Sequence, residues 1–224
     1  MKIQVKICGL NTPEVVDAAV AGGARYIGLV FFARSPRAVD PALAADLARR
    51  VPTGVRTVGL FVDPENEFLE SVLARVPLDV IQLHGEEAPP RVAEIRAMFG
   101  LPVMKAIRIA TPADVARAPE YEDMADMLLF DAKPPANVAA LPGGNGLPFD
   151  WSLLAGRSWS RPWMLSGGLN PANLAEAVTA TGATAVDVSS GVEDRPGHKT
   201  PALIRSFLTT AAGLGGGPEN GRFL

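Results

Sequence analysis

The sequence is poor in cysteine and histidine, and this shortage excludes disulfide-built folds and most metal sites. Cys8 is the only cysteine, so it cannot form a disulfide within the chain. We expect it to be a free thiol in a reducing compartment. There are two histidines, and no cluster of His, Cys, Asp and Glu has the spacing of metal ligands. We therefore expect no metal.

Long apolar runs and a basic surface are also missing. No run approaches the roughly 20 apolar residues that a membrane span needs. The segment Met1–Lys6 lacks the apolar region of a secretory signal. The net charge of −3 offers no basic surface for a nucleic acid or an anionic membrane. We expect a cytoplasmic protein that binds neither.

The sequence does contain a regular series of short apolar runs. Eight runs start roughly 20 to 35 residues apart, about the length of one strand-helix unit. Several are apolar almost throughout, which is typical of parallel strands covered on both faces. The runs are Ile3–Cys8, Tyr26–Phe32, Val55–Val62, Val80–Leu83, Val103–Ile109, Met127–Phe130, Trp163–Leu165 and Ala185–Val188.

Segments with helical periodicity lie between the runs, and six of them have a proline at or near the start. Eight alternations of strand and helix fit a closed (β/α)8 barrel or a doubly wound open sheet. An even composition favours a single (β/α)8 TIM barrel. We predict this barrel over residues 1–212 and a flexible tail over 213–224. The predicted helices are Thr12–Ala21, Pro41–Arg50, Pro64–Val76, Pro89–Phe99, Thr111–Arg117, Pro171–Thr179 and Pro201–Ala212, with a short helical piece at Asp150–Leu154.

Glycine-containing loops follow the last two predicted strands, at Ser166–Gly168 and Ser189–Gly191. Glycine lets backbone N–H groups approach an anion, and the corresponding loops form the recurrent phosphate site of TIM barrels. A third cluster, Gly143–Gly146, either adds amides to this site or is a plain flexible loop. The predicted phosphate-binding residues are Gly167, Gly168, Ser190 and Gly191.

Two side chains at predicted strand ends could serve as a base and an acid. Cys8 ends the first run, where a cation such as Lys6 would help a thiol to act as a base. A buried structural cysteine is the alternative. Asp131 ends the sixth run, where an apolar site would let a carboxyl group donate a proton. A salt bridge to Lys133 is the alternative. The two side chains could face each other across the barrel mouth.

Two further residues could hold a substrate. Arg37, in Ser35-Pro36-Arg37, could bind a carboxylate with two hydrogen bonds, or be an ordinary surface arginine. His84 could bind a substrate oxygen, or be a structural histidine. With the anion site, these residues indicate an enzyme that acts on a small phosphorylated sugar.

Taken in order, these segments resemble the phosphoribosylanthranilate isomerase family of tryptophan biosynthesis, roughly from Lys6 to Phe207. Each segment is short, but their number, order and spacing are together highly specific. The segments are Lys6–Gly9, Ser35–Arg37, Val58–Val62, Gln82–Gly85, Leu129–Asp131, Phe149–Trp151, Leu165–Leu169 and Val186–Glu193.

The resemblance implies an Amadori rearrangement of N-(5-phosphoribosyl)anthranilate to 1-(2-carboxyphenylamino)-1-deoxyribulose 5-phosphate. It places the general acid at Asp131 and the general base at Cys8, with Arg37 near the anthranilate carboxylate. His84 and Asp187 would line the substrate. No cofactor is implied, because the iminium nitrogen formed from the substrate is itself the electron sink. A monomer and a homodimer are both compatible with the sequence.

The sequence departs from the family pattern at three places. Thr200 follows Pro196–Lys199 where an aspartate is usual, and Asn145 stands where a hydroxyl residue is common. Phe32-Ala33-Arg34 replaces an aromatic-Pro-Lys segment, and Arg34 could serve as a substitute cation.

Three other functions are open to the sequence. An indole-glycerol-phosphate synthase would use a lysine such as Lys6 as its acid, and a pentose-phosphate epimerase would need metal-binding histidines. A non-catalytic phosphosugar-binding protein would need neither Cys8 nor Asp131.

Overall fold

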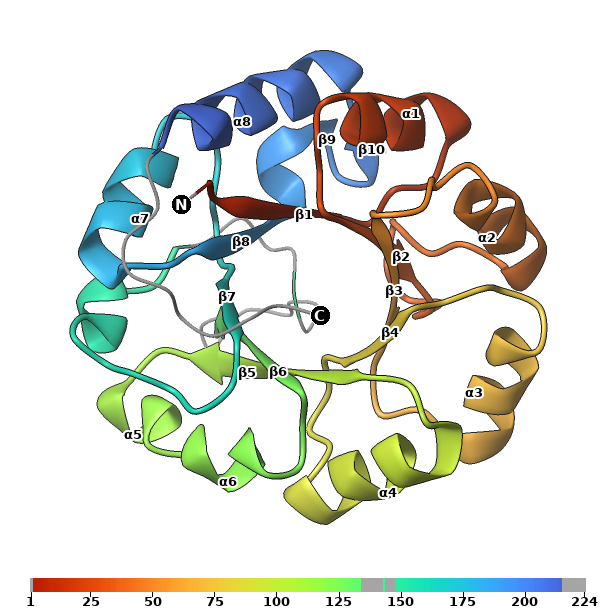
Figure 1. Ribbon diagram of the computed structural model, residues 1–224, viewed down its shortest axis with the longest axis horizontal. Coiled ribbons are helices and arrows are strands. Elements are labelled where there is room, and N and C mark those ends of the chain that lie inside the picture. Colours follow the sequence, from red (N-terminus) through yellow and green to blue (C-terminus); the bar gives the residue numbers. More distant parts are fainter. Residues whose placement is uncertain (1, 134–142, 144–147, 215–224) are drawn as a thin grey trace.

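The computed structural model describes residues 2–133, 143 and 148–214. Within these residues, eight parallel strands form a closed barrel in sequence order, and helices surround it (Figure 1). The predicted (β/α)8 barrel is confirmed. Most of the glycine-rich segment after the sixth strand, including Gly144, Asn145 and Gly146, lies outside the described residues, as does the predicted tail beyond residue 214.

The strands of the barrel coincide closely with the predicted apolar runs, because helices cover the outside and side chains fill the inside. The sixth strand runs two residues beyond its apolar run and takes Asp131 into the ladder, opposite Arg108. The first and last strands pair in parallel, with Lys6 opposite Asp187, and this pairing closes the barrel. The strands are β1 (Gln4–Cys8), β2 (Tyr26–Val30), β3 (Arg56–Phe61), β4 (Val80–Leu83), β5 (Val103–Ile109), β6 (Met127–Ala132), β7 (Trp163–Leu165) and β8 (Ala185–Val188).

Alternate residues of each strand point into the barrel, as the two-residue period of a strand requires. A larger apolar cluster joins the outward faces of the strands to the helices. On the inward positions of β1, β4 and β8, the chain carries buried polar residues, Lys6, Gln82 and Asp187. The apolar cluster inside the barrel comprises Tyr26, Val58, Val80, Met104, Ala106, Met127, Leu129, Met164 and Ala185.

The helices lie where the sequence predicts them, but some begin or end elsewhere. The helix predicted from Pro171 begins only at Leu174. The Asn170 side chain accepts hydrogen bonds from the N–H groups of Ala172 (2.9 Å) and Asn173 (3.2 Å), and these bonds replace the first helical turn. The helix predicted over Thr111–Arg117 is shorter, at Pro112–Val115, and a second short helix, which was not predicted, begins at Pro119. The helices are α1 (Pro13–Ala21), α2 (Pro41–Ala48), α3 (Asn66–Leu73), α4 (Pro89–Phe99), α5 (Pro112–Val115), α6 (Pro119–Glu122), η1 (Trp151–Leu154), α7 (Leu174–Thr181), η2 (Ser190–Val192) and α8 (Pro201–Gly213).

An antiparallel hairpin between η2 and α8 is absent from the sequence-based prediction. Its strands, β9 (Glu193–Arg195) and β10 (His198–Lys199), are short and polar, so they lack the apolar alternation that marks a strand. Gly197 turns the chain at φ 81° and packs closely on Pro36, where a Cβ would lie 2.5 Å from the carbonyl oxygen. The hairpin therefore packs on the loop after β2.

The helix after this hairpin keeps its cap despite the departure from the family pattern. The Thr200 side chain accepts a hydrogen bond from the Leu203 N–H (3.3 Å) at the start of α8. Threonine and aspartate are both common N-cap residues, so the change is conservative in structure. No described helix is long and apolar enough to cross a membrane.

Candidate active site

A pocket of about 730 Å³, open to solvent, lies at the C-terminal ends of the barrel strands. This is the end at which TIM barrels carry their active sites. The lining residues come from β1, β2, β3, β6 and β8 and from the loops that follow β2, β3, β4, β6, β7 and β8. The predicted site residues among them are Cys8, Arg37, His84, Asp131, Gly167, Gly168, Asp187 and Ser190.

Cys8 and Asp131 line this one pocket, on strands that lie apart in the barrel. The Cys8 side chain is buried and packs with Val30 and Leu60. Asp131 is also buried, and its Oδ1 accepts a hydrogen bond from the Ala132 N–H (2.9 Å). The alternative salt bridge between Asp131 and Lys133 is wrong, because Lys133 pairs with Asp114 (2.8 Å). The thiol of Cys8 and the carboxyl group of Asp131 thus line the same pocket.

Lys6 is the cation that acts on the Cys8 thiol. Its Nζ is fully buried and donates to Asp187 Oδ1 (2.9 Å), while Ser166 Oγ donates to Asp187 Oδ2 (3.2 Å). Burial raises the pKa of Cys8, and the positive charge of Lys6 opposes this rise without cancelling it. Burial alone would lower the pKa of Lys6, but the charges of Asp187 and Cys8 outweigh burial and raise it. Lys6 therefore stays protonated.

His84 lies between two buried polar side chains. Its Nδ1 is 2.9 Å from Gln82 Nε2, and its Nε2 is 3.0 Å from Asp131 Oδ2. Gly143 covers this pair, because a Cβ at that position would lie 2.6 Å from His84 Nε2 and 3.0 Å from Asp131 Oδ2. The carboxyl group of Asp131 is thus linked through His84 to Gln82.

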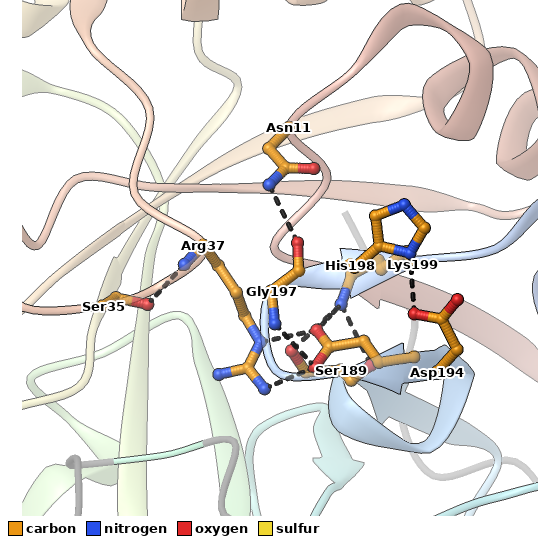
Figure 2. Close-up of polar contacts among 9 residues, drawn as sticks. Asn11, Ser35, Arg37, Ser189, Asp194, Gly197, His198 and Lys199 are labelled. Carbon is orange, nitrogen blue, oxygen red and sulfur yellow. Dashed lines mark hydrogen bonds and ion pairs between the residues drawn. The ribbon is translucent and has the colours of Figure 1, made fainter.

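Arg37 is a buried residue, so its interpretation as an ordinary surface arginine is wrong. Its Nε and Nη2 donate to Glu193 Oε1 (2.7 Å) and Oε2 (2.8 Å), and Figure 2 shows the guanidinium beside the hairpin. Lys199 Nζ also donates to Glu193 Oε1 (2.7 Å), and to the Ser189 carbonyl oxygen (3.0 Å). The predicted substitute cation, Arg34, is exposed and is not among the residues that line the pocket.

Glu193 is the carboxylate that Arg37 and Lys199 share. Burial alone would raise the pKa of Glu193, but the hydrogen bonds from Arg37 and the charge of Lys199 outweigh burial and lower it. Burial lowers the pKa of Lys199 despite the opposing charge of Glu193. Asn11 fixes the hairpin from the other side, since its Nδ2 donates to the Gly197 carbonyl oxygen (3.1 Å) (Figure 2). The hairpin thereby holds Arg37 at the edge of the pocket.

The two glycine-containing loops meet at another part of the pocket wall. Gly167 and Gly168 have positive φ values of 90° and 64°, which favour glycine. Asn173 Nδ2 donates to the Gly168 carbonyl oxygen (3.0 Å) and braces the first loop. Gly191 does not line the pocket but packs on the first loop, because a Cβ there would lie 1.9 Å from the Leu169 carbonyl oxygen. It lets the two loops touch.

Gln82, Glu193 and Lys199 have no assigned role in the sequence-based prediction. Gln82 could have been recognised from the sequence, because residues two apart on a strand share a face and His84 follows Gln82 at that spacing. Glu193 and Lys199 could not, since Glu193 meets Arg37 across 156 positions of the sequence. In the described part of the chain, no group of three or more His, Cys, Asp or Glu residues is arranged to hold a metal ion.

Comparison with known proteins identifies the family. Residues 5–210 match the family described as N-(5'phosphoribosyl)anthranilate (PRA) isomerase. The N-(5'-phosphoribosyl)anthranilate isomerase of Rhodospirillum centenum is 71% identical over 214 residues, covering 96% of this chain and 100% of the relative. That of Paracoccus denitrificans is 59% identical over 211 residues, covering 94% and 98%.

Solved structures agree with the sequence relatives. The phosphoribosyl anthranilate isomerase of Thermotoga maritima has a TM-score of 0.82 and 36% identity, covering 95% of this chain and 100% of its own. A structure of such an isomerase in complex with reduced 1-(o-carboxyphenylamino)-1-deoxyribulose 5-phosphate has a TM-score of 0.80 and 34% identity, with the same coverage. The chain belongs to the N-(5'-phosphoribosyl)anthranilate isomerase family.

Proposed function

We propose that Cys8 and Asp131 are the base and the acid of the reaction of this family. The chain is an isomerase of tryptophan biosynthesis that converts N-(5-phospho-β-D-ribosyl)anthranilate to 1-(2-carboxyphenylamino)-1-deoxy-D-ribulose 5-phosphate. The proposal depends above all on one observation, that a buried thiol and a buried carboxyl group line one pocket together with the two glycine loops. One acid and one base suffice to move a proton from C2 of an aldose derivative and to open its ring.

Binding of the substrate uses its two anionic ends. The phosphate binds at Gly167, Gly168 and Ser190, where glycine conformations leave backbone groups open to an anion. Gly191 supports this site by letting the loops pack closely. The anthranilate carboxylate lies near Arg37, and His84 and Asp187 line the sugar between the two ends. The phosphate thus anchors the sugar and orients C2 towards the base.

The reaction then proceeds through two proton transfers and a final tautomerisation, which moves a proton from the C2 hydroxyl to C1. Asp131 gives a proton to the furanose ring oxygen, the bond from C1 to that oxygen breaks, and the nitrogen lone pair forms a C1–N iminium. The Cys8 thiolate takes the proton from C2, and the electron pair of that bond forms the enolamine and neutralises the nitrogen. The enolamine then tautomerises to the ketone, and the chain needs no cofactor because the iminium is the electron sink.

Charge around Cys8 suits a base that acts after the ring has opened. The buried thiol has a raised pKa, so it must first lose its proton to solvent, and the thiolate that remains is a strong base. Lys6 supplies one nearby positive charge, and the substrate iminium supplies a second at the moment when the proton must leave C2.

The assay follows the fluorescence of phosphoribosylanthranilate in Cys8→Ala and Asp131→Ala. Each variant should lose at least about 100-fold in kcat, the usual contribution of a positioned acid or base. Calorimetry with the reduced product analogue should show that binding persists. Full turnover by both variants with binding intact would refute the two roles. An unmodified chain that binds this analogue without turnover would be the non-catalytic phosphosugar-binding protein.

The assembly state and the location in the cell belong to the same proposal. A solved relative from Thermotoga maritima is described as dimeric. We propose that this chain is a monomer or a homodimer, and sedimentation velocity distinguishes the two states. We also propose a cytoplasmic location, which fits the buried free thiol.

A further inference from the structure

His84 and Asp131 form a buried pair in which a proton could reside on either partner. An imidazole is ordinarily the stronger base, with a pKa of about 6.5 against about 3.9 for an aspartate. By ordinary basicity, a proton that enters the pair would therefore go to the histidine. Asp131 would then be an ionised partner of an imidazolium, with no proton to give to the substrate. The acid role proposed above needs the opposite distribution.

Gln82 provides a reason for that opposite distribution. Its side-chain Nε2 lies 2.9 Å from His84 Nδ1, and both residues are buried. An amide nitrogen donates hydrogen bonds and does not accept them, so Nδ1 must be the acceptor. The one proton of the ring is then on Nε2, which donates to Asp131 Oδ2 at 3.0 Å. A second ring proton on Nδ1 would face the Gln82 donor, so His84 is held uncharged.

The other end of the Gln82 amide is buried in this orientation. Its Oε1 is buried and has no hydrogen-bond partner among the described residues. Buried acceptors without a partner are rare in folded proteins and usually accompany a functional constraint. The contact that the amide makes is the one from its Nε2 to His84 Nδ1.

The charged and titratable surroundings of His84 come from several elements. Asp131 on β6 is the partner that it contacts directly. In the loops beside it, Glu87 accepts from the Gly85 N–H (3.0 Å) and Asp63 accepts from the Glu86 N–H (2.8 Å), so these carboxylates are engaged with backbone groups. The other titratable groups of the same pocket are Cys8, Arg37 and Asp187.

We propose that Gln82 is a positioning residue that keeps His84 uncharged, so that the proton for ring opening is carried by Asp131. This inference rests on the acid role of Asp131 in the proposed function. Both Asp131 oxygens accept hydrogen bonds, from Ala132 and from His84, and a protonated carboxyl group can keep both while its O–H points at the substrate.

Nitrogen NMR of the histidine rings tests the charge of His84 without using turnover. The chain has two histidines, so labelling with ¹⁵N-histidine gives two rings, and His198→Asn assigns them. At pH 7, His84 should show one protonated and one unprotonated nitrogen, with the proton on Nε2.

Two substitutions at position 82 should change the ring in a defined way. Gln82→Leu removes the donor, and Gln82→Glu replaces it by a carboxylate that accepts from Nδ1–H. His84 should become an imidazolium paired with Asp131 in both variants, at higher pH in the second. Gln4→Leu is the matched control, because Gln4 also has a buried Oε1 without a partner among the described residues but makes no histidine contact.

Kinetics then test the consequence for the acid. Gln82→Leu should lower kcat by about 10- to 100-fold while KM changes by less than about threefold, since the acid is lost and binding is not. The charge assignment is overturned by a doubly protonated His84 in the unmodified chain at pH 7, or by unchanged spectra in both variants. Unchanged kcat in Gln82→Leu overturns the link to the acid. If Asp131→Ala keeps full turnover, the proposed acid fails, and the spectra still decide the charge of His84.

Discussion

The Arg37–Glu193 ion pair allows a sharp test of how the site is held, through the substitution Glu193→Gln. The pair has two short hydrogen bonds, of 2.7 Å and 2.8 Å, and both side chains are nearly inaccessible, at 6% and 3% exposure. Glutamine has the same shape but no charge. The variant therefore leaves two buried cations, Arg37 and Lys199, without the carboxylate that they share.

The expected loss follows from the cost of a buried charge without its partner. Removing one member of a buried ion pair typically costs about 3–5 kcal/mol of unfolding free energy. For a chain of this size, about 2–4 °C of Tm corresponds to each kcal/mol, so Tm should fall by about 6–20 °C. Urea unfolding, followed by circular dichroism, and calorimetry measure the two quantities independently.

An exposed pair of the same geometry provides the control. Arg50 Nε and Nη2 donate to Asp17 Oδ1 (2.9 Å) and Oδ2 (2.5 Å), but these side chains are 44% and 51% exposed. Water already solvates both charges, so Asp17→Asn should leave the stability unchanged. The reasoning is refuted if Glu193→Gln is no less stable than Asp17→Asn.

The dependence on pH gives a second check with a definite sign. Glu193 has a pKa lowered below its ordinary value of 4.5, because the two cations outweigh burial. A carboxyl group with a lowered folded-state pKa stabilises the fold above its unfolded pKa and loses this contribution as the pH falls. The stability difference between the unmodified chain and Glu193→Gln should therefore be full above pH 4.5 and shrink below it.

Two further predictions concern the charge at Cys8 and the contact between the glycine loops. In Lys6→Met, the Cys8 thiol loses the positive charge of Lys6, which lowers its pKa. The rising limb of kcat/KM against pH should therefore move to higher pH, and activity below the limb should fall about tenfold for each unit of pKa. A limb that does not move contradicts this. In Gly191→Ala, the new Cβ would lie 1.9 Å from the Leu169 carbonyl oxygen, so the loops must part and the affinity for inorganic phosphate, measured by calorimetry, should fall. Gly213→Ala, where a Cβ meets nothing within 4 Å, should bind phosphate as the unmodified chain does.

Much of the fold follows from local sequence patterns. Eight apolar runs at strand-helix spacing predict the barrel, because parallel strands covered on both faces need nearly continuous apolar residues. The same pattern places Cys8 and Asp131 at strand ends, and hence in one pocket. These inferences need no knowledge of which side chains touch.

The remaining features depend on contacts that the sequence does not announce. Glu193 is an ordinary acidic residue until a polar hairpin brings it to Arg37, and Gly191 resembles a ligand-binding glycine until its contact with Leu169 is seen. The start of α7 at Leu174 reflects a competition between side-chain and backbone hydrogen bonds at Asn170, whose outcome depends on the surrounding loop.

The bond between Arg37 and Glu193 also has a consequence for the order of events during synthesis. The arginine leaves the ribosome long before its carboxylate, which follows 156 residues later, and β8 joins β1 only at that late stage. The pair can therefore form only when the last quarter of the barrel has been made. An interaction that forms late contributes little to the folding rate and acts mainly by slowing unfolding. During synthesis, the hairpin therefore joins Arg37 only after the rest of the barrel has been made.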